Sequence, residues 1–183
     1  HILYNRILSI HGDTFHELGD LKVLDLRSNS IPELNKGTFR ALRKLRILVL
    51  TNNNNTVLRE GTFVGLKNLK KLDLKGNRIE SISAGVFGAI CYDNFTLTCP
   101  NLTRLWRYCD TQFVLENLTY LDLGTNNITS IHQHAFLGCN KLQTLYLAYN
   151  RLKTLDFLYT PELTYLNLFS NRNLSTLSNS TFN

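Results

Sequence analysis

Residues 69–79 read LKKLDLKGNRI, and this stretch decides the fold because versions of it recur along the chain. The shared pattern is L-x-x-L-x-L-x-x-N. Copies open at Leu21, Leu45, Leu69, Leu118, Leu142 and Leu163. The first three copies start 24 residues apart, as do the copies at Leu118 and Leu142. A period of this length is typical of a solenoid, in which each repeat is one unit stacked on its neighbours.

A repeat this short cannot bury its own apolar side chains, so neighbouring repeats must stack to remove the leucines from water. Stacking places the strands parallel and about 4.8 Å apart, with the longer return segments on the opposite side. We therefore expect one domain over residues 1–183, with about seven repeats plus partial ends. A parallel β-sheet should line the concave face, and loops with short helical or 3-10 turns should form the convex face.

Three kinds of position within the repeat have a mechanical role. Leu24 and Leu26 should point into the core, which leaves Val23, Asp25 and Arg27 on the concave face. The asparagine that ends each strand should satisfy backbone groups where the chain turns, because an amide both donates and accepts hydrogen bonds. A buried aromatic row should follow ten residues after the asparagines, at Phe15, Phe39, Phe63, Phe87 and Phe136.

The stretch 91–117 departs from the pattern, and we interpret it as one irregular repeat. Tyr92, Phe95 and Leu97 match the three strand leucines, and Pro100 falls where the asparagine is expected. Proline lacks the donor that asparagine supplies, so we expect an irregular turn there. On this interpretation Asn94 lies in the concave row, and a sugar attached to it would interrupt that face.

Composition indicates a secreted or lumenal chain. No apolar run reaches the roughly 18 residues of a membrane-spanning helix. Sequons of the form Asn-X-Ser/Thr, which mark glycosylation sites in secreted proteins, occur at Asn54, Asn94, Asn101, Asn117, Asn127, Asn173 and Asn179. Neither end carries a cysteine-rich cap to shield the core, so we expect an uncapped fragment of a longer solenoid.

Residues 63–79, FVGLKNLKKLDLKGNRI, closely resemble the extracellular leucine-rich repeat. That family includes Toll-like receptor ectodomains, insect Toll proteins, Slit-type guidance proteins and the variable lymphocyte receptors of jawless vertebrates. The uneven repeat lengths, the irregular repeat 91–117 and the dense sequons are most similar to a Toll-like receptor ectodomain. The resemblance implies an α/β-type leucine-rich-repeat solenoid, located outside the cell or in the endosomal lumen as the ectodomain of a single-pass membrane protein.

The resemblance also implies a binding function. Toll-like receptors sense microbial or danger molecules by binding and dimerising, so we expect a protein or microbial ligand and a receptor homo- or heterodimer. The alternative is a guidance, matrix or variable-lymphocyte-receptor-type protein that binds another protein or a sulfated glycan. We expect no enzyme and no cofactor, because no nucleophile–base pair or phosphate-binding glycine loop stands in register. His132 and His134 have no third ligand in register for a metal.

The concave face offers the first candidate site, because it is the wide surface that packing does not use. Aromatic side chains on it supply large contact area at little entropic cost. Strand propensity favours the same residue types, so a purely structural role is the alternative. The candidate partner-binding residues are Arg27, Val49, Lys71, Asp73, Lys75, Tyr120, Asp122, Tyr146, Tyr165 and Phe169.

The edge at which the strands start offers the second candidate. Residues 20–80 carry 13 of the 20 Lys and Arg residues but six of the 14 acidic residues, which favours an acidic partner. Lys22, Arg46 and Lys70 share one register, in a stripe that should end at Asp93. Such a stripe suits phosphate or sulfate groups of a nucleic acid or sulfated glycan, although charged edges often serve solubility alone. The candidate anion-binding residues are Lys22, Arg43, Lys44, Arg46, Lys67 and Lys70.

Four cysteines allow disulfides without requiring them. Cys139 falls in the apolar position held by Leu42, Leu66 and Ile90 in other repeats, so we expect a free, buried thiol. Cys91 and Cys99 flank an extended stretch that holds them too far apart for a disulfide. Two pairings remain open: Cys91 with Cys109, which we favour, and Cys99 with Cys109.

Overall fold

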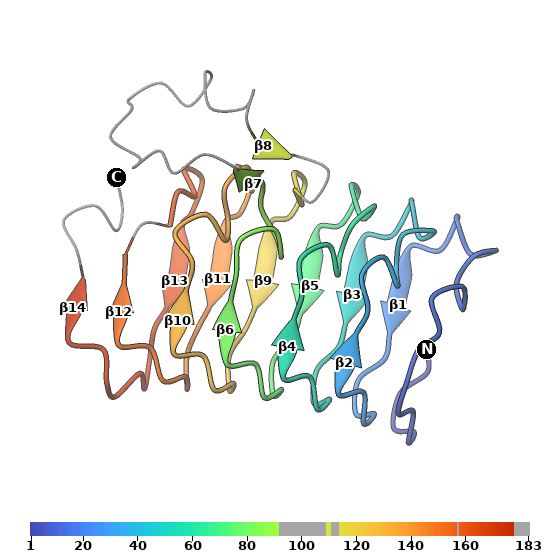
Figure 1. Cartoon of the computed structure of the whole chain (residues 1–183), viewed down its shortest axis with the longest axis horizontal. Helices are drawn as coiled ribbons and strands as arrows, with labels where there is room; N and C mark the ends of the chain where they lie inside the picture. Colours follow the sequence, from blue (N-terminus) through green and yellow to red (C-terminus); the bar gives the residue numbers. More distant parts are fainter. Residues whose placement is uncertain (92–108, 111–113, 157, 178–183) are drawn as a thin grey trace.

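The computed structural model describes residues 1–91, 109–110, 114–156 and 158–177, which wind into a stack of coils with two rows of short strands. The main sheet is parallel and six-stranded. Its strands, in spatial order, are β1 (Val23–Asp25), β3 (Ile47–Val49), β5 (Lys71–Asp73), β9 (Tyr120–Asp122), β11 (Thr144–Tyr146) and β13 (Tyr165–Asn167). Figure 1 shows this sheet running along the length of the molecule, which confirms the predicted solenoid.

A second row of two-residue strands lies on the return side of each coil (Figure 1). They form the parallel pairs β2 (Glu33–Leu34) with β4 (Val57–Leu58), β6 (Ser81–Ile82) with β10 (Ser130–Ile131), and β12 (Thr154–Leu155) with β14 (Thr176–Leu177). The described residues contain no regular helix. The return segments instead close single turns, such as the one in which Leu42 N–H donates to the Phe39 carbonyl at 2.9 Å.

The core is built from the predicted leucines and phenylalanines. Leu48, Leu50, Leu72 and Leu74 are fully buried, and burying each contributes about 1.5–3 kcal/mol. The rings of Phe15, Phe39, Phe63, Phe87 and Phe136 stack in one row, with neighbouring centroids 5.8–6.2 Å apart. Both the inward leucines and the aromatic row are therefore confirmed.

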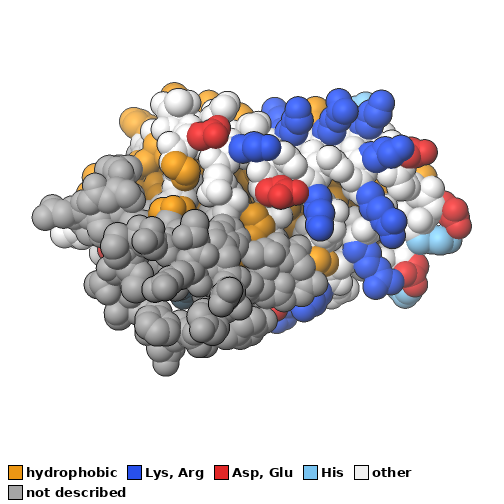
Figure 2. Space-filling model, turned by 90° about the horizontal axis from the view of Figure 1, so that it is seen from above, with side chains coloured by type: hydrophobic (Ala, Val, Ile, Leu, Met, Phe, Trp, Pro, Cys, Tyr) orange, Lys and Arg blue, Asp and Glu red, His pale blue; other side chains and the backbone are white. Residues whose placement is uncertain are grey.

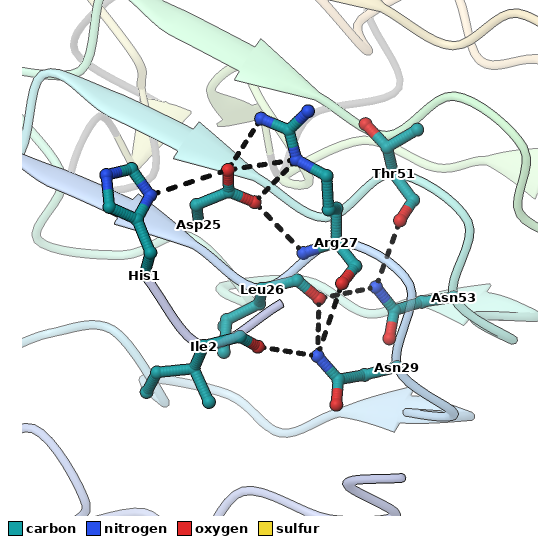
Figure 3. Close-up of polar contacts among 8 residues, drawn as sticks. All are labelled: His1, Ile2, Asp25, Leu26, Arg27, Asn29, Thr51 and Asn53. Atoms are coloured by element: carbon teal, nitrogen blue, oxygen red, sulfur yellow. Dashed lines mark hydrogen bonds and ion pairs between the residues drawn. The ribbon is translucent and has the colours of Figure 1, made fainter. Parts of the chain in front are cut away.

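The predicted asparagine ladder holds adjacent coils together (Figure 3). Asn29 Nδ2 donates to the Ile2 carbonyl at 2.8 Å and to the Leu26 carbonyl at 2.9 Å, while its Oδ1 accepts from Ile7 N–H at 3.1 Å. Asn53 repeats the arrangement one coil later, with Nδ2 donating to Leu26 and Leu50 carbonyls. Each amide thus satisfies buried backbone groups of its own coil and the previous one.

The interpretation of residues 91–117 as a stacked repeat is wrong. Strand β5 pairs directly with β9, with Leu72 opposite Leu121, so no strand from residues 92–98 lies between them. The aromatic row agrees, because Phe87 stacks on Phe136 at 5.8 Å. The main sheet of the described residues therefore has six strands, and β9 takes the place beside β5 where a strand of the irregular repeat was expected. Residues 94–98, Asn94 among them, lie outside the described residues.

The same correction relocates one core position. Leu115, not Ile90, follows Phe87 in the coil: its N–H donates to the Phe87 carbonyl at 2.9 Å, as Leu42 does to Phe39, and its side chain is buried. Residues 90–114 are therefore an insertion within one coil. At its base, β7 (Ile90–Cys91) and β8 (Cys109–Asp110) pair antiparallel.

Candidate ligand-binding surfaces

Aromatic side chains dominate the C-terminal half of the concave face. The ring centroids of Tyr120 and Tyr146 lie 5.6 Å apart, and those of Tyr146 and Tyr165 lie 5.1 Å apart. Strands β9, β11 and β13 position them on the outward face of the sheet. Tyr120 and Tyr165 are the first residues of β9 and β13, whereas Tyr146 is the last residue of β11, so their rings meet diagonally across the strands. We call Tyr120, Tyr146, Tyr149, Tyr165 and Phe169 the aromatic patch.

Much of the aromatic patch is open to solvent. Tyr165 is 46% exposed, Phe169 is 65% exposed and Tyr149 is 57% exposed. Tyr149 and Phe169 meet edge to face at 5.3 Å. Large apolar side chains that neighbour one another and remain uncovered are characteristic of a contact surface rather than a core.

Sequence reasoning missed Tyr149. It precedes Asn150, at a position that has positive φ in each coil of the main sheet, with φ of 56° at Tyr149 itself. Other coils mostly place a small or polar residue there: Ser28, Asn52, Gly76, Thr125 and Ser170. A bulky residue is uncommon in this backbone region. A tyrosine directly before the repeat asparagine was therefore the sequence feature that could have pointed to Tyr149 as a surface residue.

A pocket of about 340 Å³ opens within the aromatic patch. Its lining combines rings with polar groups: Lys75, Tyr120, Asp122, Gly124, Thr125, Tyr146, Ala148, Tyr149 and Asn167. Such a mixed lining offers ring faces for contact and polar groups that can orient a ligand.

Asp122 supplies the acidic group of the pocket. Only 8% of the residue is exposed, and its Oδ1 accepts from Gly124 N–H at 2.8 Å. Burial raises the pKa of the Asp122 carboxyl, and the nearby Asp73 charge raises it further. Burial beside Asp122 also raises the pKa of the Tyr120 hydroxyl to about 12, so this phenol remains a hydrogen-bond donor at physiological pH.

Two lysines bring positive charge to the patch. Lys71 Nζ lies 4.6 Å from the Tyr120 ring centroid, and Lys75 is exposed at the pocket margin. Asp73, in the same strand as Lys71, accepts from Lys75 N–H at 3.1 Å through Oδ1. The candidate residues Lys71, Asp73 and Lys75 are therefore brought next to the tyrosines.

The candidates at the N-terminal end of the sheet are less available. Arg27 is held by Asp25, with Nη2 2.6 Å from Oδ2 (Figure 3). The Arg27 hydrogen bond lowers the pKa of the Asp25 carboxyl. The expected exposure of Val49 is wrong: it is 8% exposed because Asp25 and Asp73 flank it at the same register.

The basic edge is the second surface, and it consists of Lys22, Arg43, Lys44, Arg46, Lys67 and Lys70, all exposed. Figure 2 shows Lys and Arg side chains gathered over the N-terminal half of the molecule, seen from the side where the main strands start. Backbone hydrogen bonds connect equivalent positions on successive coils, from Lys22 to Arg46, then to Lys70 and then to Thr119. The stripe therefore ends at Thr119, and the expected end at Asp93 is wrong.

Known proteins share the repeat architecture. The family described as Leucine rich repeat matches residues 1–54, 43–90, 99–152 and 116–172, which together exceed half of the chain. The chain belongs to the leucine-rich repeat family. No curated protein sequence matches it at a significant level.

Among solved structures, this leucine-rich repeat chain is similar to the crystal structure of a TLR13–ssRNA13 complex, with 27% sequence identity and a TM-score of 0.79. It is also similar to a structure of the Drosophila Toll–Spatzle complex, with 23% identity and a TM-score of 0.70, a likeness that shows the fold alone. The alignments cover 98% and 97% of this chain but 23% and 20% of those chains. This chain thus spans less than a quarter of their length.

The cysteines of this leucine-rich repeat chain have two different environments. Cys139 is a free, fully buried thiol, as expected, and burial raises its pKa to about 12. Cys91 lies directly opposite Cys109 in the β7–β8 pair. This register favours the pairing of Cys91 with Cys109, which remains a prediction; Cys99 lies outside the described residues.

Four of the predicted glycosylation sites fall in described parts of the leucine-rich repeat coils. Asn173 is exposed, whereas Asn54 and Asn127 are partly buried. Asn117 is hydrogen-bonded at the end of the basic edge, where Nδ2 donates to the Lys67 carbonyl and Oδ1 accepts from Lys141 Nζ, both at 2.8 Å. The sites Asn94, Asn101 and Asn179 lie outside the described residues.

The histidines and acidic residues of the described coils do not gather into a metal site. No group of three or more His, Cys, Asp or Glu side chains there could hold an ion. His132 Nδ1 accepts a hydrogen bond from the His134 backbone N–H at 3.1 Å, so the two histidines are linked to each other.

Among the residues that the structure describes, no helical segment has the length and hydropathy needed to cross a membrane.

Proposed function

We propose that this chain is a ligand-binding segment of a Toll-like receptor ectodomain, which senses microbial or danger molecules by binding and receptor dimerisation. The similarity to TLR13 over 98% of the chain supports this assignment. The seven sequons support a location outside the cell or in the endosomal lumen. In this proposal the segment takes part in binding and carries out no catalytic step.

The aromatic patch is the observation on which the proposal depends. Its rings come from three adjacent strands and the turns that follow them, and none is packed into the core. Tyr120, Tyr146 and Tyr149 line the 340 Å³ pocket. Rigid aromatic side chains anchor interfaces because they bury much area while losing few rotatable bonds. We place the ligand over this half of the concave face.

Single-stranded RNA is the ligand class that the patch fits best. The tyrosine rings are 5.1–5.6 Å apart, and planar bases stack on such rings regardless of sequence. Lys71 and Lys75 place positive charge beside the rings, where phosphates would follow the bases. The similar TLR13 structure was solved with ssRNA13.

The direct test is the fluorescence anisotropy of a labelled single-stranded RNA of roughly a dozen nucleotides, with the unchanged chain and with the double variant Tyr146→Ser/Tyr165→Ser. Stacking contributes about 1–3 kcal/mol per base, so the double variant should bind at least about 30-fold more weakly. Tyr4→Ser is the matched control, because Tyr4 is 73% exposed but lies at the other end of the sheet. Equal binding by the double variant, or no binding by the unchanged chain, would refute an RNA ligand on this patch.

A further inference from the structure

The basic edge is a charged surface that RNA binding at the aromatic patch does not require. Lys22, Arg46 and Lys70 occupy equivalent positions on three adjacent coils: Arg46 N–H donates to the Lys22 carbonyl at 2.8 Å, and Lys70 N–H donates to the Arg46 carbonyl at 2.9 Å. Neighbouring members of the row therefore follow at the strand spacing of about 4.8 Å. A second row runs beside it through Arg43 and Lys67, where Asn68 Nδ2 bridges to the Arg43 carbonyl at 2.7 Å.

Most cations of this edge lack acidic partners. Lys44 is paired with Asp20 at 2.7 Å, which lowers the pKa of the Asp20 carboxyl. Within the described residues, Arg43, Arg46, Lys67 and Lys70 form no ion pair. Lys22 makes no direct ion pair either, but its charge also helps to lower the pKa of Asp20. Like charges at neighbouring positions repel one another, so the edge carries an electrostatic cost that a bound polyanion would relieve.

Cations elsewhere on the coils are arranged differently. Arg59 reaches across to Glu33 on the neighbouring coil at 2.6 Å, and Arg40 lies 3.8 Å from Asp13 of the coil before it. There, neighbouring coils pair opposite charges, as Lys44 does with Asp20, whereas the row of Lys22, Arg46 and Lys70 repeats the same charge on three coils. The contrast separates this edge from an ordinary solvated surface.

The edge has a defined length. After Lys70 the row continues with Thr119, Gln143 and Thr164, which are uncharged, and the row of Arg43 and Lys67 continues with Glu116. The uncompensated charge thus covers three coils, roughly 10 Å from Lys22 to Lys70 at the strand spacing. A ligand for it must present several anionic groups within that distance.

We propose that the basic edge binds a linear sulfated polysaccharide. Sulfates spaced along a polysaccharide match two rows of long, flexible cationic side chains. The described residues of these rows include no aromatic side chain on which bases could stack, so a sulfated chain fits better than single-stranded nucleic acid. The site is independent of the aromatic patch and of its ligand.

A fluorescent, fully sulfated heparin oligosaccharide tests the proposal by anisotropy, measured over a series of salt concentrations. The variant Lys22→Glu/Arg46→Glu/Lys70→Glu should bind at least about 10-fold more weakly, with a shallower dependence of log K on log salt, because fewer counterions are released. The control Arg78→Glu/Arg151→Glu/Lys153→Glu makes the same charge change at exposed positions after the asparagine row and should retain binding within about threefold.

Several results would overturn the proposal. One is an equal loss of heparin affinity in the edge variant and in the control variant; another is that desulfated heparin binds as tightly as sulfated heparin. The proposal also fails if the unchanged chain does not bind heparin at physiological salt, or if a short RNA duplex binds the basic edge more tightly than heparin does. If the Glu variant loses its circular dichroism signal, Lys22→Gln/Arg46→Gln/Lys70→Gln replaces it, with the same expectation. Tyr146→Ser/Tyr165→Ser should bind heparin unchanged, so failure of this proposal and failure of the RNA proposal are distinguishable.

Discussion

The backbone N–H of Ile79 donates to Oδ1 of Asn126 at 3.0 Å, across 47 residues of sequence. In four other coils the same bond spans 22 residues, as between Ile31 and Asn53, and in the coil of Leu152 and Asn171 it spans 19. The asparagine ladder therefore continues past residues 90–114 as though they were absent.

Deleting residues 90–114 should leave the fold intact. The deletion joins Ala89 to Leu115 and restores the spacing that runs from Phe63 to Leu66 in the preceding coil. Because closing a loop of this length costs entropy, the melting temperature should stay the same or rise slightly. Circular dichroism and thermal melting check this, and an unfolded or molten product would show that the segment is part of the stack.

Asn77→Ala should be strongly destabilising. Its Nδ2 donates to the Leu50 and Leu74 carbonyls at 3.0 and 2.9 Å, and its Oδ1 accepts from Asn55 N–H at 3.1 Å. Leaving these buried groups unsatisfied should lower the free energy of unfolding by about 3–5 kcal/mol. Urea denaturation measures it. Asn140→Ala, at an exposed asparagine, is the control and should change stability by less than about 0.5 kcal/mol.

Stability should decline in mildly acidic buffer because of His134. Burial, together with the neighbouring His132, lowers the pKa of His134 below 6.5. The unfolded chain therefore binds the proton more readily, so the stability present above pH 6.5 is lost as pH falls through the folded-state pKa. His134→Asn should reduce the loss of melting temperature between pH 7.5 and 5, while His11→Asn should not. An identical pH profile for all three proteins would contradict this account.

Cys91 and Cys109 should form a disulfide when the chain is produced in an oxidising compartment. The two residues are direct partners in the register of the antiparallel β7–β8 pair. Direct partners in an antiparallel pair have Cα atoms about 4.5–5.5 Å apart, which is within disulfide reach. Peptide mapping by mass spectrometry without reduction should recover the two cysteines in one linked species, and Cys139 as a free thiol. A linked Cys99–Cys109 species would favour the alternative pairing.

The periodic features of the fold could be predicted from sequence because each has one physical cause. Inward leucines, the amide at Asn53 and the ring at Phe63 all follow from stacking identical coils. The insertion could not, since Tyr92, Phe95 and Leu97 satisfy the apolar pattern as well as a true strand does. Only the strand pairing distinguishes residues 92–97 from a true strand of the main sheet. In the structure β5 pairs directly with β9, so this stretch takes no place between them.

The candidate site was only partly predictable for a related reason. Tyr120, Tyr146 and Tyr165 follow from strand alternation, so their shared face was foreseeable. The burial of Val49 depends on the neighbours that flank it in the sheet, which a single repeat does not reveal. Tyr149 reaches the patch through a positive φ, a property of the turn rather than of the strand.

Hydroxyl-radical footprinting of the chain, with and without single-stranded RNA, shows whether a ligand contacts the aromatic patch. RNA should protect Tyr146, Tyr165 and Phe169 from oxidation and leave Tyr4 as reactive as before. Protection of Tyr4 or the return-side residues, with the patch still fully reactive in saturating RNA, would contradict this prediction.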